Sequence, residues 1–369
     1  MTINIYSFFA GGGFLDLGFE KSGFDIVLVN EFDKDFMDIY KYSRENMNLP
    51  KPKHGYHNCS IHDFLKGSGR QQVKRFIEVD KLNNDIIGFI GGPPCPDFSV
   101  AGKNQGIEGD NGKLTTLYKR IILDNTPDFF LLENVKGLWT TKKHRIEYER
   151  LKKSFKRKGY VLLENLANSL EYGVPQYRER IFLLGFKKSL FNDKEQIKQL
   201  LLDFNWGKAP NFNLDNVLNL PWPTTHPYKS NSVLQPPTGV LTELTAQYWF
   251  EKNNVLNHPN AKDYFVPYSD KFKSISEGDI SRKSFKRLHR WRFSPTVAYG
   301  NNEVHLHPYL PRRLSVSEAL SLQSLPKKYI IKEDVTLTKK FKLVGNGVPY
   351  LMSKGIATEI YNTLLRLNN

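Results

Sequence analysis

The chain has 369 residues, of which 40% are hydrophobic and 13% aromatic, enough to bury a sizeable core in one large domain or two. Lys and Arg number 53 against 38 Asp and Glu, a net charge of +15 that either attracts a polyanion such as nucleic acid or simply keeps a basic surface soluble. Two cysteines exclude a disulfide framework, and no run approaches the roughly 18 apolar residues of a membrane span, so we expect an unexported cytoplasmic protein with no membrane partner.

Short β-rich runs alternate with helical stretches over residues 2–186. The expected strands are residues 3–9, 25–30, 85–90, 128–132, 160–166 and 181–186. The expected helices are residues 15–22, 114–124 and 143–158, the last stopped by Gly159. This rhythm predicts an α/β fold built on a doubly wound, mostly parallel sheet.

The periodicity weakens over residues 187–293, where tryptophans are scattered among Pro, Asn and Ser, so we expect a second, smaller, loop-rich unit there. Order returns at Ser315, whose capping box with Glu318 opens a helix that we expect to end at Pro326. A last amphipathic helix is expected over residues 348–367.

Cys95 lies in a rigid turn, GGPPCPDFS at residues 91–99, directly after the apolar strand 85–90. Ligands of open α/β sheets bind in the crevice beyond the carboxyl ends of the strands. A thiol at that place suits a nucleophile better than a packing residue.

Two polar features follow the first two strands. The glycines of residues 11–13 open a helix, where backbone N–H groups can approach a cofactor closely, although such a turn can also serve only the fold. Glu31 ends the second strand, where a carboxylate can grip a ribose diol; its alternative is a solvated surface charge.

Glu133 ends another strand on the same edge as Cys95, where it can carry a proton or bind a ring nitrogen, or can be an ion-paired structural acid. Arg178 and Arg180 share a face by the two-residue period and suit an anionic or carbonyl oxygen. Alternatively, they form ion pairs with Glu133 or Glu179.

Seven blocks of this sequence, in this order, resemble the DNA (cytosine-5) methyltransferases of bacterial restriction-modification systems. They are FAGGG at 9–13, NE at 30–31, GPPC at 92–95, ENV at 133–135, QYRER at 176–180, RLSVSEA at 313–319 and GNGV at 345–348. Only residues 187–293 lie outside the matched region.

The resemblance implies a Rossmann-like methyltransferase in which Cys95 adds to carbon 6 of a cytosine. It further implies that Glu133 contacts ring N3 and the exocyclic amine, and that Arg180, supported by Arg178, contacts O2. The base has to leave the duplex to be reached. Residues 99–112 match the loop that closes over DNA. The implied DNA contacts are Ser99, Lys103, Asn104 and Gln105 in this loop, together with Gln176.

The resemblance also implies S-adenosyl-L-methionine as cofactor, S-adenosyl-L-homocysteine as product, and no metal. The implied cofactor residues are Phe9, Ala10, Gly11, Gly13, Phe14, Leu15, Glu31, Phe32, Ser60, Ile61, Pro93, Asn346 and Val348.

The sequence departs from the family pattern at three places. Phe14 stands where a second glycine is usual, and Pro96-Asp97 replaces a glutamine and a small residue. Ser60 stands where an acid usually meets the adenine amine, so Ser60 itself or Asp63 takes that role.

By the same resemblance, residues 1–186 form the catalytic and cofactor-binding domain, residues 187–294 a target-recognition domain, and residues 295–369 a return segment completing the catalytic domain. Basic residues interleaved with aromatics suit phosphate contact, or else form a solvated basic helix. These are Arg282, Lys283, Lys286, Arg287, Arg290 and Arg292.

The expected function is transfer of a methyl group to carbon 5 of one cytosine in a short duplex DNA sequence. We expect a monomer that protects its site from a cognate restriction endonuclease acting on the same sequence. Three alternatives stay open: a tRNA cytosine-5 methyltransferase, a catalytically inactive DNA-binding regulator, and a small-molecule methyltransferase.

Overall fold

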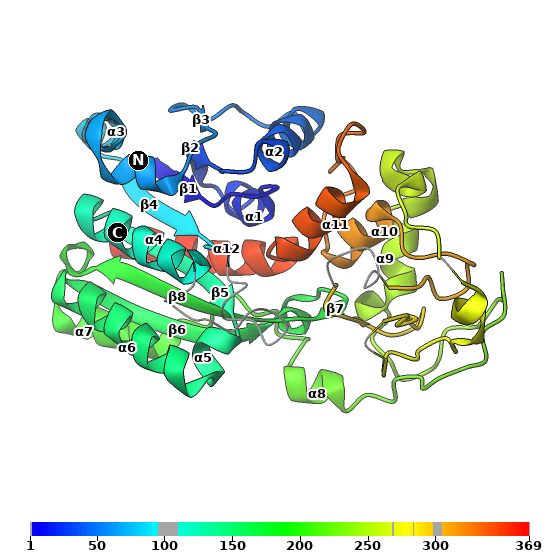
Figure 1. Cartoon of the computed structure of the whole chain (residues 1–369). Coiled ribbons are helices and arrows are strands. Elements are labelled where there is room, and N and C mark those ends of the chain that lie inside the picture. Colours follow the sequence, from blue (N-terminus) through cyan, green and yellow to red (C-terminus); the bar gives the residue numbers. More distant parts are fainter. Residues whose placement is uncertain (1, 95–109, 268, 283, 298–304, 369) are drawn as a thin grey trace.

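A seven-stranded sheet forms the centre of the computed structural model, which describes residues 2–94, 110–267, 269–282, 284–297 and 305–368 (Figure 1). The strand order is β3-β2-β1-β4-β5-β8-β6, with β8 antiparallel to both neighbours and the other pairs parallel. The strands are β1 (Ile3–Phe8), β2 (Asp25–Asn30), β3 (Tyr56–His57), β4 (Ile86–Gly91), β5 (Phe129–Val135), β6 (Tyr160–Asn168) and β8 (Glu179–Lys187). The predicted mostly parallel α/β fold is confirmed.

Helices cover both faces of the sheet, because its strands are apolar on both sides and need two covering layers. One face packs against α3 (Gly67–Leu82), α4 (Asp110–Asn125) and α6 (Lys142–Arg157), which follows the short α5 (Gly137–Thr140). The other face packs against α1 (Phe14–Glu20), α2 (Lys34–Asn46), α7 (Lys194–Asp203) and α12 (Tyr350–Asn368). The expected helices form as α1, α4, α6 and α12, whereas α2, α3 and α7 were not predicted.

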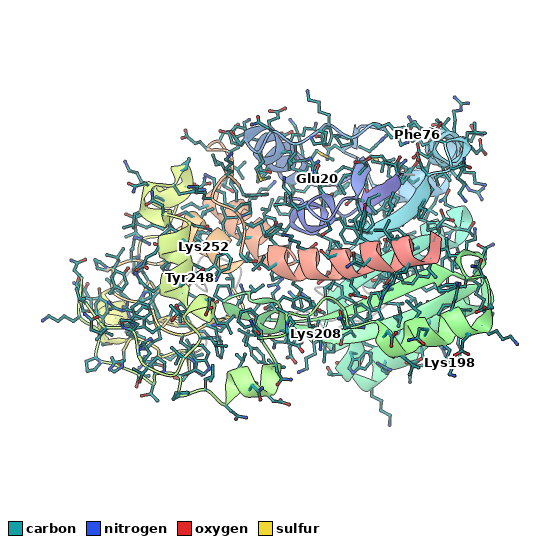
Figure 2. All side chains as sticks on the ribbon, turned by 180° about the vertical axis from the view of Figure 1, so that it is seen from behind. Glu20, Phe76, Lys198, Lys208, Tyr248 and Lys252 are labelled. Atoms are coloured by element: carbon teal, nitrogen blue, oxygen red, sulfur yellow. The ribbon has the colours of Figure 1, made fainter. Side chains whose placement is uncertain are left out.

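The carboxyl-terminal helix α12 returns to the sheet beside α1, as Figure 1 and the rear view in Figure 2 show. Met352, Ile356 and Ile360 pack in one core with Ile3 and Ile5 of β1. Ser353 on α12 donates a 2.6 Å hydrogen bond to the carbonyl of Leu15 in α1. The two ends of the chain thus build one core.

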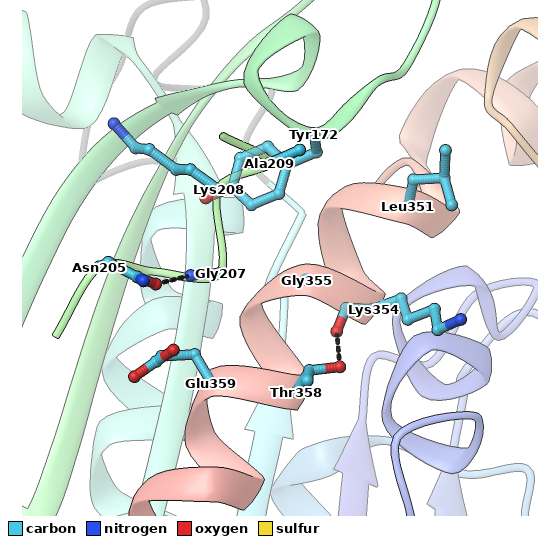
Figure 3. A pocket seen from close by; sticks show the side chains of 10 residues that line it. All are labelled: Tyr172, Asn205, Gly207, Lys208, Ala209, Leu351, Lys354, Gly355, Thr358 and Glu359. Carbon is cyan, nitrogen blue, oxygen red and sulfur yellow. Dashed lines mark hydrogen bonds between the residues drawn. The ribbon is translucent and has the colours of Figure 1, made fainter. Parts of the chain in front are cut away.

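The chain stays on this core for some distance beyond β8. Phe204 and Trp206 pack with the sheet, and a Cβ on Gly207 would lie only 1.9 Å from the carbonyl oxygen of Gly355, so this segment lies directly on α12. A hollow of about 300 Å³ runs along that contact (Figure 3). Neither Glu133 nor Arg180 lines it.

The remaining residues form a loop-rich unit beside the carboxyl edge of the sheet (Figure 1). Its regular elements are α8 (Leu214–Leu218), α9 (Ala246–Lys252), α10 (Val316–Leu322), α11 (Leu337–Asn346), and the pair β7 (Gln176–Tyr177) and β9 (Ser294–Pro295). Along the whole of the described chain, short 3₁₀ turns occur at Ile61–Leu65, Ser169–Tyr172, Lys188–Leu190, Thr242–Leu244, Val255–Asn257, Pro259–Lys262 and Asp270–Ser274.

The predicted capping box of Ser315 and Glu318 forms at the start of α10, but the helix ends at Leu322 before reaching Pro326. A separate core joins α10 and α11 to Phe250 of α9 and Phe14 of α1, so this unit is anchored on the glycine-rich turn that precedes α1. Among the described residues, no helix is both long and apolar enough to cross a membrane.

Close packing inside the sheet gives the first prediction. A Cβ on Gly88 in β4 would lie 2.2 Å from the ring of Phe129 in β5. Gly88→Ala should therefore lower the free energy of unfolding by about 1–3 kcal/mol through overpacking. Ser154→Ala on the surface of α6 is the control and should change it by less than about 0.5 kcal/mol. Urea unfolding measures both, and a Gly88→Ala value near that of the control would contradict this packing.

Candidate active site

Three strands bring the candidate catalytic residues to one edge of the sheet. Gly91 at the end of β4 pairs with Leu132 of β5, so Gly92 and Glu133 follow side by side. Arg180 near the start of β8 pairs with Val135 at the end of β5. Because β8 runs antiparallel to β5, its beginning lies where β5 ends.

Glu133 and Arg180 form a buried ion pair. The Arg180 Nε lies 3.0 Å from the Glu133 Oε1, and the side chains are 12% and 10% exposed. Burial raises the pKa of the Glu133 carboxyl above its usual range, while the charges of Arg180 and Arg178 act to lower it. The carboxyl can therefore hold a proton at a higher pH than an exposed glutamate does.

Gly92 places the start of the cysteine turn against this carboxyl. A Cβ at residue 92 would lie 2.6 Å from the Glu133 Oε2, so a larger residue there would displace the acid. Cys95, Ser99, Lys103, Asn104 and Gln105 lie outside the described residues. Their predicted roles stay predictions.

Arg178 is used differently from Arg180. Its side chain is fully buried, and its Nη2 donates hydrogen bonds of 2.8 Å and 3.0 Å to the carbonyls of Gly345 and Gly347. It therefore holds the turn on both sides of Asn346, which is exposed. The two arginines that the sequence places on one face support two different parts of the site.

The glycine-rich turn after β1 is held by Glu31 at the end of β2. The Glu31 carboxylate accepts 2.8 Å hydrogen bonds from the backbone N–H groups of Gly11 and Asp33. Gly13 adopts a left-handed conformation with φ 77° before α1, and Phe9 is also left-handed with φ 55°. Burial raises the pKa of Glu31, against the opposing effect of these backbone donors.

Phe32 follows Glu31 and is 76% exposed. Exposure of an aromatic ring to water is unfavourable, so this ring is available to pack against a bound molecule. Ser60 caps the turn Ile61–Leu65 by accepting from the His62 N–H, whereas Asp63 is exposed. Leu15 and Val348 are buried in the core that α1 and α12 form with the sheet, and Ala10 packs against that core. Ile61 is buried in the core on the opposite face, and Pro93 is buried as well.

Phe14, the departure from the usual glycine, has a clear packing role. Its ring meets Tyr329 edge-on at 5.1 Å, and a Cβ on Gly347 would lie 2.0 Å from it. Tyr329 in turn donates a 2.7 Å hydrogen bond to the carbonyl of Gly12. The aromatic pair thus ties the first glycine turn to the last block of the chain.

Sequence reasoning missed the group beneath that turn. Asp16 is fully buried and accepts 2.8 Å hydrogen bonds from Ser7 and Tyr40. Burial raises the pKa of Asp16 to about 6. In the sequence, the only sign of this group was an acidic residue in the first turn of a helix that opens on glycines. Its partner Tyr40 lies in α2, a helix that was not predicted.

Two arginines that we expected to contact DNA have their partners inside the protein. Arg287 is fully buried and donates to the carbonyls of Phe272, Ile275 and His307. Arg290 forms a buried ion pair with Glu277 at 2.8 Å. We therefore assign these two guanidiniums to the interior.

Gln176 is likewise buried and bonded to the backbone of Leu322 and Val297. Among the remaining expected contacts, Arg282 is exposed, Lys286 and Arg292 are half-buried, and Lys283 lies outside the described residues. In the described part of the chain, no group of three or more His, Cys, Asp or Glu side chains is placed to hold a metal ion.

The fold and site define a Rossmann-like α/β enzyme with a nucleotide-type glycine turn and an acid–arginine pair at one edge. The model of the C-5 cytosine-specific DNA methylase family matches residues 3–362. The chain belongs to this family, and its predicted function as a DNA cytosine-5 methyltransferase is confirmed at that level.

Relatives are similar over most of their length. Identity to Type II methyltransferase M.NmeDI of Neisseria meningitidis serogroup C is 51%, over 98% of this chain and 84% of that protein. Identity to Type II methyltransferase M.FnuDI of Fusobacterium nucleatum is 29%, over 98% and 95%.

Solved structures share the fold. A protein assigned as a prophage DNA modification methyltransferase of E. coli superposes with a TM-score of 0.66 at 23% identity, over 99% of this chain and 100% of that one. The Dnmt2 methyltransferase of S. pombe superposes with a TM-score of 0.60 at 15% identity, over 100% of both chains.

The ion pair gives a prediction about pH. Arg180→Gln removes a positive charge that lowers the pKa of Glu133, so that pKa should rise further. A carboxyl whose pKa is higher in the folded state than in the unfolded state lowers the free energy of unfolding when it is ionised. This loss is absent at pH values below the unfolded-state pKa and is complete at pH values above the folded-state pKa. The loss of unfolding free energy in Arg180→Gln should therefore be larger at about pH 8 than at about pH 5.5.

Urea unfolding at the two pH values measures this difference. Arg120→Gln, on the exposed surface of α4, removes the same charge away from the site and is the control. Equal losses at both pH values for Arg180→Gln would show that Arg180 does not control the protonation of Glu133.

Proposed function

We propose that this chain uses S-adenosyl-L-methionine to methylate carbon 5 of one cytosine in a specific duplex DNA sequence, as the modification enzyme of a Type II restriction-modification system. The observation that carries the proposal is the Glu133–Arg180 pair beside Gly92, on the same sheet edge as the Glu31-bound glycine turn. The names of the 51% and 29% identical relatives support the Type II assignment.

In the proposed reaction the base leaves the duplex and enters the edge of the sheet beyond β4 and β5. The Cys95 thiolate adds to carbon 6 while Glu133 gives a proton to ring N3, which makes carbon 5 electron-rich. Arg180 holds Glu133 and donates to O2 of the base. Loss of the carbon 5 proton later releases the thiolate.

The cofactor fits the residues around the first glycine turn. The Glu31 oxygens each hold one backbone N–H and keep further lone pairs for a ribose diol. The exposed Phe32 ring offers a stacking face for adenine, and open space surrounds Gly11. Bound there, S-adenosyl-L-methionine supplies an electrophilic methyl group.

The part of the loop-rich unit that falls within residues 187–294 belongs to the proposed target-recognition domain, and residues 295–369, which include α10 and α11, complete the proposed catalytic domain. Arg282, Lys286 and Arg292 are the proposed phosphate contacts, with Lys283. The enzyme acts as a monomer in the cytoplasm, where its DNA lies. The cognate endonuclease acts on the same sequence and needs no contact with this chain.

The nucleophile is tested with Cys95→Ser. Methyl transfer to DNA should fall below about a thousandth of wild type while the duplex still binds, because the covalent step is lost. Bisulfite sequencing of plasmid DNA from cells expressing each protein identifies the modified cytosine and its sequence. Wild-type protein that binds duplex DNA but modifies no cytosine would favour the regulator, and methylation of tRNA in its place would favour the RNA enzyme.

A covalent adduct gives a second readout of the same step. Wild-type protein should form a denaturation-resistant complex with duplex DNA carrying 5-fluorocytosine at the identified position, because fluorine cannot leave as the proton does. Cys95→Ser should form none. An adduct with the variant would remove Cys95 from the mechanism.

The stacking role of Phe32 is tested by direct binding. Phe32→Ala should weaken S-adenosyl-L-homocysteine binding by about 1–2 kcal/mol, roughly a tenfold rise in Kd, and Phe32→Trp should retain affinity. Isothermal titration calorimetry measures this without turnover. Leu82→Ala, which removes an 83% exposed apolar side chain from α3, is the control, and an equal Kd for Phe32→Ala and wild type would exclude the stacking role.

A further inference from the structure

Helix α6 carries an unusual share of the positive charge. Residues 142–158 contain nine lysines and arginines and two glutamates, a net charge of +7 out of +15 for the whole chain. The exposed residues of this stretch are all basic except one, Ile146. They are Lys142, Lys143, Arg150, Lys153, Lys156, Arg157 and Lys158.

Part of this charge is accounted for by the fold. Glu149 pairs with Arg145 and Lys152, Glu147 pairs with Arg150, and the last helical turn favours cations through the helix dipole. The buried face of α6 is formed by His144, Tyr148, Leu151 and Phe155 and needs none of the outer cations. Among the described residues, Lys142, Lys153 and Arg157 have no ion pair.

The basic surface extends beyond the helix. Lys187 in β8 pairs with Tyr160 at the end of the α6 connection, and the Lys188 N–H donates to the Gly159 carbonyl at 2.9 Å. Burial lowers the pKa of Lys187, and the charges of Lys81 and Lys158 lower it further. Like charges held together weaken the fold unless an anion offsets them.

The position of α6 relates this surface to the substrate. The helix starts just after α5, which follows the end of β5 where Glu133 lies, and it runs away from that edge along the outside of the sheet (Figure 1). Sixteen residues of helix span about 24 Å. That length matches about seven base pairs of duplex at roughly 3.4 Å each.

We propose that the exposed face of α6, the α6 surface of Lys142, Lys153, Lys156, Arg157 and Lys158, binds double-helical DNA outside the recognition sequence. It holds the phosphate backbone of non-target DNA while the target cytosine occupies the edge at Glu133. The proposal uses family membership in the DNA methylases and adds a second, sequence-independent contact surface. Lysines and arginines spaced along one helix face suit phosphates and read no bases.

The test compares two triple variants. Lys142→Gln/Lys153→Gln/Arg157→Gln removes three charges from the α6 surface. Lys194→Gln/Lys198→Gln/Lys354→Gln removes three exposed charges from α7 and α12 on the opposite face, where Figure 2 shows Lys198. Glutamine keeps helix propensity in both. Methylation of a short duplex shows that each variant is folded and active.

Binding is measured by fluorescence anisotropy over a range of salt concentrations on two duplexes. One carries the recognition sequence with about three flanking base pairs on each side, and the other with about twenty, lengths chosen around the roughly seven base pairs that α6 spans. The α6 variant should bind the long duplex roughly tenfold more weakly at physiological salt, with a salt slope reduced by about two to three. Its affinity for the short duplex should stay within about twofold of wild type, within the scatter of a surface change.

Three results would overturn the proposal. Equal affinities of the two variants for the long duplex would show that only the overall field matters. Equal losses on the short and long duplexes would place the contact within the recognition site. A loss confined to a structured RNA competitor, with long DNA binding unchanged, would assign the surface to RNA.

Discussion

The ion pair between Glu133 and Arg180 is the interaction on which the rest of the site depends. A buried carboxylate without a partner would take up a proton or be expelled to water, and Arg180 keeps it in place at 3.0 Å. The pair exists because β8 is inserted antiparallel between β5 and β6. In an all-parallel sheet, the start of that strand would lie at the opposite edge and Arg180 could not reach Glu133.

Contacts between residues distant in sequence also fix the glycine-rich turn before α1. Arg178 binds the carbonyls of Gly345 and Gly347, while Phe14 and Tyr329 tie the first glycine turn to the same region. The glycine-rich turn is thereby held by residues from the other end of the chain. A shift of the last block would disturb both sides of the site together.

The sequence was sufficient for six strands of the central sheet, because buried apolar runs such as β4 and β5 are distinct without tertiary information. The two-residue strand β3 and the β7–β9 pair were not predicted, because strands so short have no periodicity of their own. The sequence could not show the direction of β8, since a strand that is apolar on both faces has the same pattern in either direction. It also misassigned Arg287 and Arg290, because a run of basic residues does not reveal burial. Arg290 is buried because it pairs with Glu277 and also donates hydrogen bonds to Ser232, and both partners precede it in the chain.

Arginine and lysine divide the positive charge of this protein between two tasks. Buried guanidiniums such as Arg178 and Arg287 satisfy several backbone carbonyls at once, which a planar group with five donors can do and an ammonium cannot. Because these charges are buried and hydrogen-bonded within the protein, they add little to the surface contact with DNA. The charge that a phosphate backbone can meet is the exposed part, and its densest helical segment is α6. The net charge of this chain is therefore informative about a polyanionic partner only when the buried arginines are left out of the count.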